Sequence, residues 1–104
     1  MSDNDNYDRE CINLVDSNIN TTVPWYIMAS YAYYELDDPI LSDASFDRLC
    51  RKILDKWDEI VHHHKEYVTK ENLIAGTYLG EYPKRVQGAI ESLTGKRYAK
   101  RNTI

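Results

Sequence analysis

The sequence predicts an all-α fold: a small helical domain of about four helices, built on an antiparallel helix hairpin. From Phe46 to His64, apolar residues recur at the i, i+3, i+4, i+7 spacing of an amphipathic helix. A second helical pattern covers residues 23–36, and only the short loop around Pro39 separates the two patterns. No segment shows a convincing alternation of apolar and polar residues, which would be typical of a strand.

Length and composition agree with a single domain over residues 1–104. The chain has 104 residues, of which 29% are charged and 42% hydrophobic, as in ordinary globular domains. No apolar run approaches the roughly 18 residues of a membrane-spanning helix, and the acidic N-terminal segment does not resemble a signal peptide. We therefore expect a cytoplasmic protein without a membrane partner. Cys11 and Cys50 are then expected to be reduced thiols, with Cys50 in the core.

Short motifs predict the elements of the N-terminal half. Residues 1–9 are polar and acidic and are expected to be disordered. An apolar cluster at residues 11–15 predicts one or two helical turns. Thr22 is the candidate N-cap of the helix over residues 23–36. This helix is expected to end before Pro39, because the residue that precedes a proline avoids the α region.

The second helix of the hairpin is predicted over residues 43–64, with Ser42 as its N-cap. The hairpin as a whole then covers residues 22–64. The side chains expected to pack its two helices together lie on the apolar face of each pattern. They are Trp25, Met28, Ala32, Phe46, Leu49, Ile53 and Trp57.

Residues 65–104 are predicted to form a helical C-terminal part that ends in a basic tail. Thr69 is the expected N-cap of a short third helix, which ends at Gly76. A fourth helix is expected from Pro83 to Gly95.

Charge is distributed unevenly along the chain. Residues 81–104 contain six basic and two acidic side chains, a charge of +4, so residues 1–80 carry −8 and the whole chain −4. A run of basic residues is usually a solvated surface. The alternative is a weak contact between this basic tail and nucleic acid or an acidic partner.

The most informative segment extends from Tyr31 to Leu49, where aromatic residues end the first helix and carboxylates begin the second. Asp43 and Asp47 are four residues apart and therefore share one helix face. Aromatic rings beside carboxylates suit a cationic ligand that carries hydroxyl groups. The alternative is purely structural: acidic residues stabilise the N-terminal end of a helix, and Tyr31 and Tyr34 pack in the hairpin.

The same segment resembles a known protein family. From Tyr33 to Leu49 the chain has the sequence Y-Y-E-L-D-D-P-I-L-S-D-A-S-F-D-R-L. This is similar to the pattern Y-[HY]-x-x-D-x-P-x-[IV]-[SP]-D-A-E-Y-D-x-L in the N-terminal helical domain of NAD-dependent DNA ligases, called domain Ia. The surrounding helices extend the resemblance to residues 22–62. Phe46 stands where the family has Tyr and lacks its hydroxyl, and Ser45 replaces a Glu that would complete a capping box.

The resemblance implies a function for the module. Domain Ia binds the nicotinamide mononucleotide half of NAD for a neighbouring nucleotidyltransferase domain, so a separate protein with such a domain is the implied partner, in DNA replication or DNA repair. Tyrosine faces attract the cationic nicotinamide ring by about 0.5–2 kcal/mol. Aspartates accept hydrogen bonds from the ribose hydroxyls and the carboxamide. The residues that match the family's ligand contacts are Tyr33, Tyr34, Asp43, Phe46 and Asp47.

Other features of the sequence limit this interpretation. The chain has no K-x-D-G motif, which carries the adenylated lysine in the family, so it is not expected to be catalytic alone. Side chains of the consecutive residues His62, His63 and His64 cannot converge on one ion, and no metal is expected. The alternative function is a non-catalytic helical interaction protein that keeps the hairpin and binds a protein or nucleic-acid partner.

Overall fold

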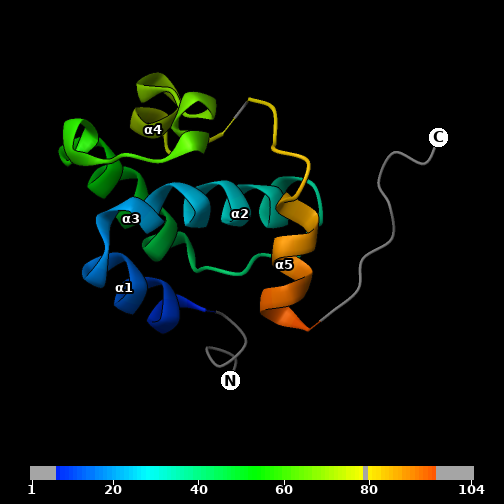
Figure 1. Ribbon diagram of the computed structural model, residues 1–104. Coiled ribbons are helices and arrows are strands. Elements are labelled where there is room, and N and C mark those ends of the chain that lie inside the picture. Colours follow the sequence, from blue (N-terminus) through cyan, green and yellow to red (C-terminus); the bar gives the residue numbers. More distant parts are fainter. Residues whose placement is uncertain (1–6, 79, 96–104) are drawn as a thin grey trace.

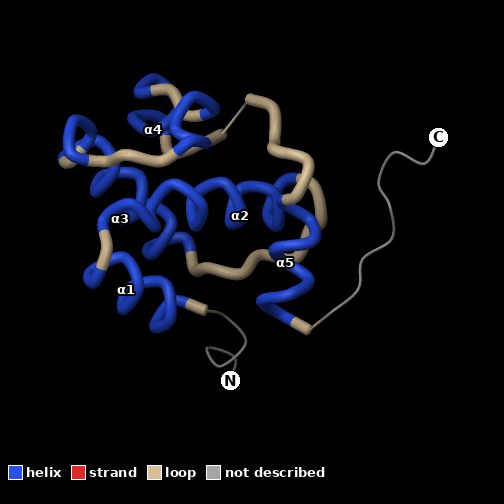
Figure 2. Tube along the Cα trace, in the orientation of Figure 1, coloured by secondary structure: helices blue, strands red, loops and turns tan. Residues whose placement is uncertain are grey.

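The computed structural model describes residues 7–78 and 80–95 (Figure 1). This part of the chain contains helices and loops but no strand (Figure 2), which confirms the all-α prediction. Its five α-helices are α1 (Asp8–Ser17), α2 (Thr22–Tyr34), α3 (Asp43–Asp55), α4 (Lys70–Ala75) and α5 (Val86–Thr94). Three short 3-10 helices accompany them: η2 (Ile19–Thr21), η3 (Trp57–Glu59) and η4 (His63–Tyr67).

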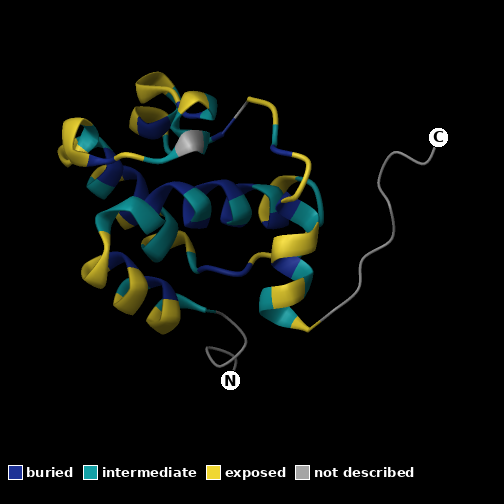
Figure 3. Ribbon diagram, viewed as in Figure 1, coloured by how far each residue is buried: buried dark blue, intermediate teal, exposed yellow. Residues whose placement is uncertain are grey.

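Helix α2 forms the centre of the molecule and packs against α3, α5, η2 and η4 (Figure 1). Eight of its 13 residues are buried, and α2 is largely dark blue in Figure 3. Val23, Tyr26 and Ala32 have no exposed surface at all. A helix that is apolar all round belongs in the interior, and the other elements cover it.

The turn between α2 and α3 matches the predicted hairpin. Asp37 adopts a left-handed conformation with φ of 54°, which aspartate tolerates better than most residues. The Asp38 N–H then donates a hydrogen bond to the Ala32 carbonyl at 2.9 Å and closes the end of α2. At the start of α3, the Ser42 hydroxyl accepts a hydrogen bond from the Ser45 N–H at 3.1 Å. The predicted N-cap at Ser42 is therefore confirmed.

The second helix is shorter than the predicted range of residues 43–64, because α3 ends at Asp55. Side chains from elsewhere stabilise the backbone that follows. Asn20 accepts a hydrogen bond from the Val61 N–H at 2.7 Å, and the Lys65 ammonium donates to the carbonyls of Trp57 and Ile60. These bonds replace the helical ones and let Ile60 become buried, so tertiary contacts override the periodic pattern.

The N-terminal part differs from the prediction in two places. Helix α1 begins at Asp8, inside the 1–9 segment expected to be disordered. The Tyr7 N–H donates to the Ile40 carbonyl, and the Asp8 carboxylate accepts from the Ser42 N–H, so this end is anchored to the hairpin loop. Positions 1–6 lie outside the described residues. Thr22 is the first residue of α2 and not its N-cap; its buried hydroxyl donates to the carbonyl of Ile19.

The C-terminal helices largely follow the prediction. Thr69 caps α4 by accepting a hydrogen bond from the Asn72 N–H, and Gly76 and Gly95 end α4 and α5. Helix α5 begins at Val86, three residues after the predicted Pro83, because residues 83–85 form a turn first. The predicted basic tail beyond Gly95 lies outside the described residues. Within the described ranges, every helix is too short or too polar to cross a membrane.

Most of the predicted core residues pack as expected. Trp25, Ala32, Leu49 and Ile53 are buried, and Met28, Phe46 and Trp57 pack against them at the edge of the core. Trp57 is only partly buried, and the ammonium groups of Lys65 and Lys70 lie over its ring, 4.6 and 5.4 Å from the ring centre. Cys11 and Cys50 are both free thiols, and Cys50 is buried as predicted; Cys11 is buried as well.

Truncation of the core should be costly at Ile53, which is fully buried. Ile53→Ala removes three heavy atoms from a packed interior and should lower the free energy of unfolding by about 2–5 kcal/mol. Urea denaturation followed by circular dichroism measures this loss. Val61→Ala is the control, since Val61 is 76% exposed and its truncation should change stability by less than about 0.5 kcal/mol. Equal midpoints for the two variants would contradict this assignment of the core.

The buried thiols give a second prediction. Burial raises the pKa of both Cys11 and Cys50 to about 12, with Asp8 and Asp47 adding smaller contributions in the same direction. Both thiols therefore stay protonated in the folded protein near pH 8, and only a thiolate reacts quickly. Alkylation by iodoacetamide at pH 8 should be slow until urea unfolds the chain. Mass spectrometry measures it, and rapid modification of the native protein would contradict the predicted burial.

Candidate functional site

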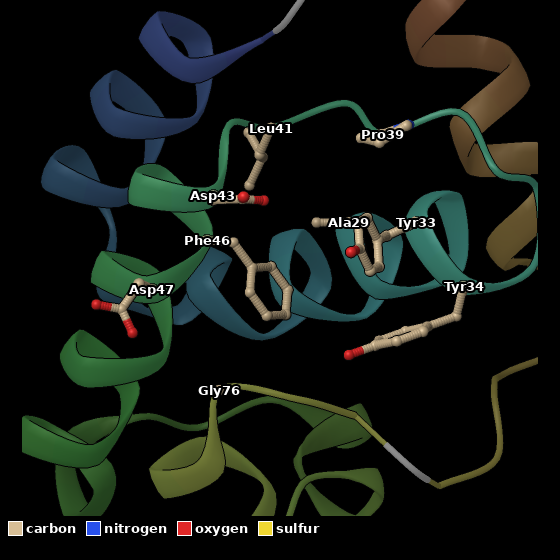
Figure 4. A pocket seen from close by; sticks show the side chains of 9 residues that line it. All are labelled: Ala29, Tyr33, Tyr34, Pro39, Leu41, Asp43, Phe46, Asp47 and Gly76. Carbon is tan, nitrogen blue, oxygen red and sulfur yellow. The ribbon is translucent and has the colours of Figure 1, made fainter.

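A cavity of about 220 Å³ lies where the end of α2 faces the start of α3 (Figure 4). The loop between the two helices forms one edge, and the end of α4 forms the opposite edge. All five residues that the sequence singled out line this cavity. The described residues that line it are Ala29, Tyr33, Tyr34, Pro39, Leu41, Asp43, Phe46, Asp47 and Gly76.

Two tyrosines of the last turn of α2 form the aromatic side of the cavity. Tyr33 is 52% exposed and Tyr34 is 41% exposed, so both rings are accessible to a ligand. Their ring centres are 4.9 Å apart, and the planes meet at 87° in an edge-to-face arrangement. Partial burial, with smaller contributions from Tyr33 and Cys50, raises the pKa of Tyr34. The Tyr34 hydroxyl therefore remains a hydrogen-bond donor at neutral pH.

The two carboxylates differ in their surroundings. Asp47 forms an ion pair with Arg51, one helical turn further along α3, and both side chains are more than half exposed. Asp43 lies in the first turn of α3, directly after the Ser42 cap. Within the described residues, no ion pair involves Asp43. Asp43 is therefore the carboxylate that is better placed to accept hydrogen bonds from a ligand.

Phe46 forms the inner wall and connects the cavity to the core. Its ring stacks on Tyr26 with centres 5.6 Å apart and planes at 25°. Tyr26 is fully buried, and its hydroxyl donates a hydrogen bond to the Thr77 carbonyl. Burial strongly raises the pKa of Tyr26, so this donor keeps its proton. The arrangement fixes Phe46 against the interior, while the space in front of it stays open (Figure 4).

Sequence reasoning missed the remaining lining residues, which are small or apolar. Ala29 lies one helical turn before Tyr33, and its short side chain leaves room for the cavity. This spacing was the signal that could have identified it. Gly76 has a φ of 73°, where other residues are strained, and a Cβ there would lie 4.0 Å from the Asp47 carboxylate. Only the fold brings Gly76 to the cavity, since nothing in the local sequence links it to the hairpin.

The charge of the lining defines what the site can hold. Among the described residues that line the cavity, Asp43 and Asp47 are acidic and none is basic. Exposed tyrosine faces beside carboxylates favour a flat, cationic ring that also carries hydrogen-bond donors. In the described residues, no three His, Cys, Asp or Glu side chains are grouped so that they could hold a metal ion.

Comparison with known proteins identifies the segment that carries this site. The model of a family described as "DNA ligase-like, N-terminal NAD+-binding domain" matches residues 26–72. No solved structure matches the chain significantly. The matched segment contains α3, most of α2, and all five of the predicted site residues. The match over residues 26–72 confirms the resemblance to this family that the sequence predicted.

Proposed function

We propose that the cavity between α2 and α3 binds the nicotinamide mononucleotide half of NAD. One observation carries the proposal: Tyr33, Tyr34, Asp43, Phe46 and Asp47 line a single cavity within a segment that matches the model of an NAD+-binding family. These side chains are chemically different but lie around one cavity, and each suits a different part of the ligand.

The cationic nicotinamide ring would lie between the tyrosines and Phe46. The faces of these rings attract a pyridinium by about 0.5–2 kcal/mol each, and more where water is excluded. Asp43 would accept hydrogen bonds from the carboxamide or the ribose hydroxyls. Asp47, held by Arg51, would contribute at the rim of the cavity. Tyr34 can donate a hydrogen bond from its protonated hydroxyl.

The size of the cavity indicates weak binding by this chain alone. At about 220 Å³ it is smaller than the roughly 300–1,000 Å³ of most ligand pockets, so it accommodates a ring and part of a sugar. The rest of the ligand would remain in solvent and would therefore contribute little to the affinity. Phe46 also lacks the hydroxyl that the family's tyrosine would supply. We therefore expect a dissociation constant near 1 mM, which corresponds to about 4 kcal/mol of binding free energy.

A second protein would complete the site. The half-exposed rings of Tyr33 and Tyr34 leave one side of the ligand uncovered, and a separate nucleotidyltransferase domain is the partner that the resemblance implies. In this proposal the chain presents the nicotinamide half of NAD, and the partner supplies the lysine that accepts AMP. A cytoplasmic location and a link to DNA replication or DNA repair belong to the same proposal.

Ligand titration tests the proposal directly. Nicotinamide mononucleotide should shift the backbone amide signals of Ala29 and Gly76 in NMR spectra at millimolar concentration. Nicotinamide riboside should bind at least as tightly, because no described lining residue is basic and could pair with the phosphate. AMP lacks the cationic ring and should bind at least tenfold more weakly. Equal binding of AMP and nicotinamide mononucleotide, or no binding of either, would favour the alternative of a helical interaction protein.

Asp43→Asn isolates the contribution of charge in the same titration. The amide keeps the shape of the carboxylate, so affinity should fall about fivefold to tenfold while the melting temperature changes little. Asp58→Asn is the matched control, since Asp58 is exposed in η3 and does not line the cavity. Affinities that fall equally in both variants would show an effect of net charge and not a contact at Asp43.

Covalent chemistry should be absent from the isolated chain. Adenylation needs an activated lysine and a clamp for the phosphates, and the sequence has no K-x-D-G motif to supply them. Incubation with NAD followed by intact-mass spectrometry should therefore leave the mass of the chain unchanged. A stable AMP adduct on any lysine would overturn the proposed accessory role.

A further inference from the structure

A second cavity, of about 520 Å³, opens on α2 through residues that the first site does not use. The floor comes from α2, one wall from residues 62–67, and the other wall from residues 83–89. Because the three parts are distant in sequence, only the fold creates this groove. Its lining is Pro24, Ile27, Met28, His62, His64, Tyr67, Pro83, Lys84, Arg85, Val86 and Ala89.

The groove is basic in a chain that is acidic overall. Lys84 and Arg85 are exposed on one wall, and none of the described residues that line the groove is acidic. The whole chain carries a charge of −4, and the first cavity contains two carboxylates and no described basic residue. The positive charge is therefore local, and it favours an anionic occupant.

The opposite wall of the groove presents a row of three rings. The ring centres of His62 and His64 are 5.4 Å apart, and those of His64 and Tyr67 are 5.6 Å apart. His62 is held in place because its Nδ1 accepts a hydrogen bond from the His64 N–H at 3.1 Å. An unpaired nucleotide can stack its base on the rings of one wall and place its phosphate beside the cations of the other.

We propose that this groove binds a short stretch of single-stranded nucleic acid. The bases would lie against His62, His64 and Tyr67, and the phosphates would contact Lys84 and Arg85. A double helix keeps its base faces stacked inside and would use only the two cations. An acidic peptide would also satisfy the cations but would gain little from the row of rings. The single strand is the occupant that uses both walls.

Fluorescence anisotropy with a labelled oligothymidylate of about ten nucleotides tests the charged wall. Each phosphate contact contributes about 0.7 to the dependence of log affinity on log salt concentration for single strands. Lys84→Ala/Arg85→Ala should therefore bind more weakly and lower this salt slope by about 1.4. Lys52→Ala/Lys56→Ala changes the net charge equally, but both lysines lie outside the groove, so it should keep the parent's slope. Residues 96–104 are identical in all three proteins.

Tyr67→Leu tests the wall of rings. It keeps an apolar side chain, so the melting temperature should change little, but affinity should fall at least fivefold with an unchanged salt slope. Equal binding by the two double variants, or unchanged affinity in Tyr67→Leu, would overturn the proposal. An acidic peptide or a DNA duplex of the same charge that binds as tightly as the oligothymidylate would also overturn it, since the groove would then recognise charge alone.

Discussion

The ring of Tyr26 lies where α2, α3 and the segment after α4 meet, and the candidate site depends on its packing. It stacks on Phe46 of α3, meets Tyr78 edge-on with centres 5.5 Å apart, and donates a hydrogen bond to the Thr77 carbonyl. Burial of an aromatic ring removes a large apolar surface from water, and rings in contact prefer particular orientations. The Tyr26 hydroxyl is buried as well and therefore needs a hydrogen-bond partner. One side chain therefore connects α2 to Phe46 of α3 and to the segment directly after Gly76, although it does not line the first cavity itself.

The sequence was sufficient to predict the parts of the fold that local chemistry decides. The Ser42 cap, the Thr69 cap and the glycine ends at Gly76 and Gly95 each follow from a single residue and its immediate neighbours. The convergence of the five site residues was also predictable, because the short loop around Pro39 brings the end of one helix close to the start of the next. The motif and the cavity therefore coincide.

Contacts between distant residues decided what the sequence could not predict. The apolar period continues past Asp55, yet Lys65 and Asn20 take over the backbone hydrogen bonds there and end the helix. Gly76 and the basic groove have the same origin, since each depends on which elements are adjacent in space. The central position of α2 was equally hidden, because its apolar pattern alone does not show which elements cover it.

The central position of α2 constrains how the protein can change during evolution. Its residues contribute to the core, to the first cavity and to the basic groove at once, so most substitutions there affect stability as well as a surface. Tolerated variation should instead collect in the segments that cover the helix, where Lys84, Arg85 and Asp47 are solvent-exposed. A domain built in this way can change its outer surface while its central helix stays nearly the same.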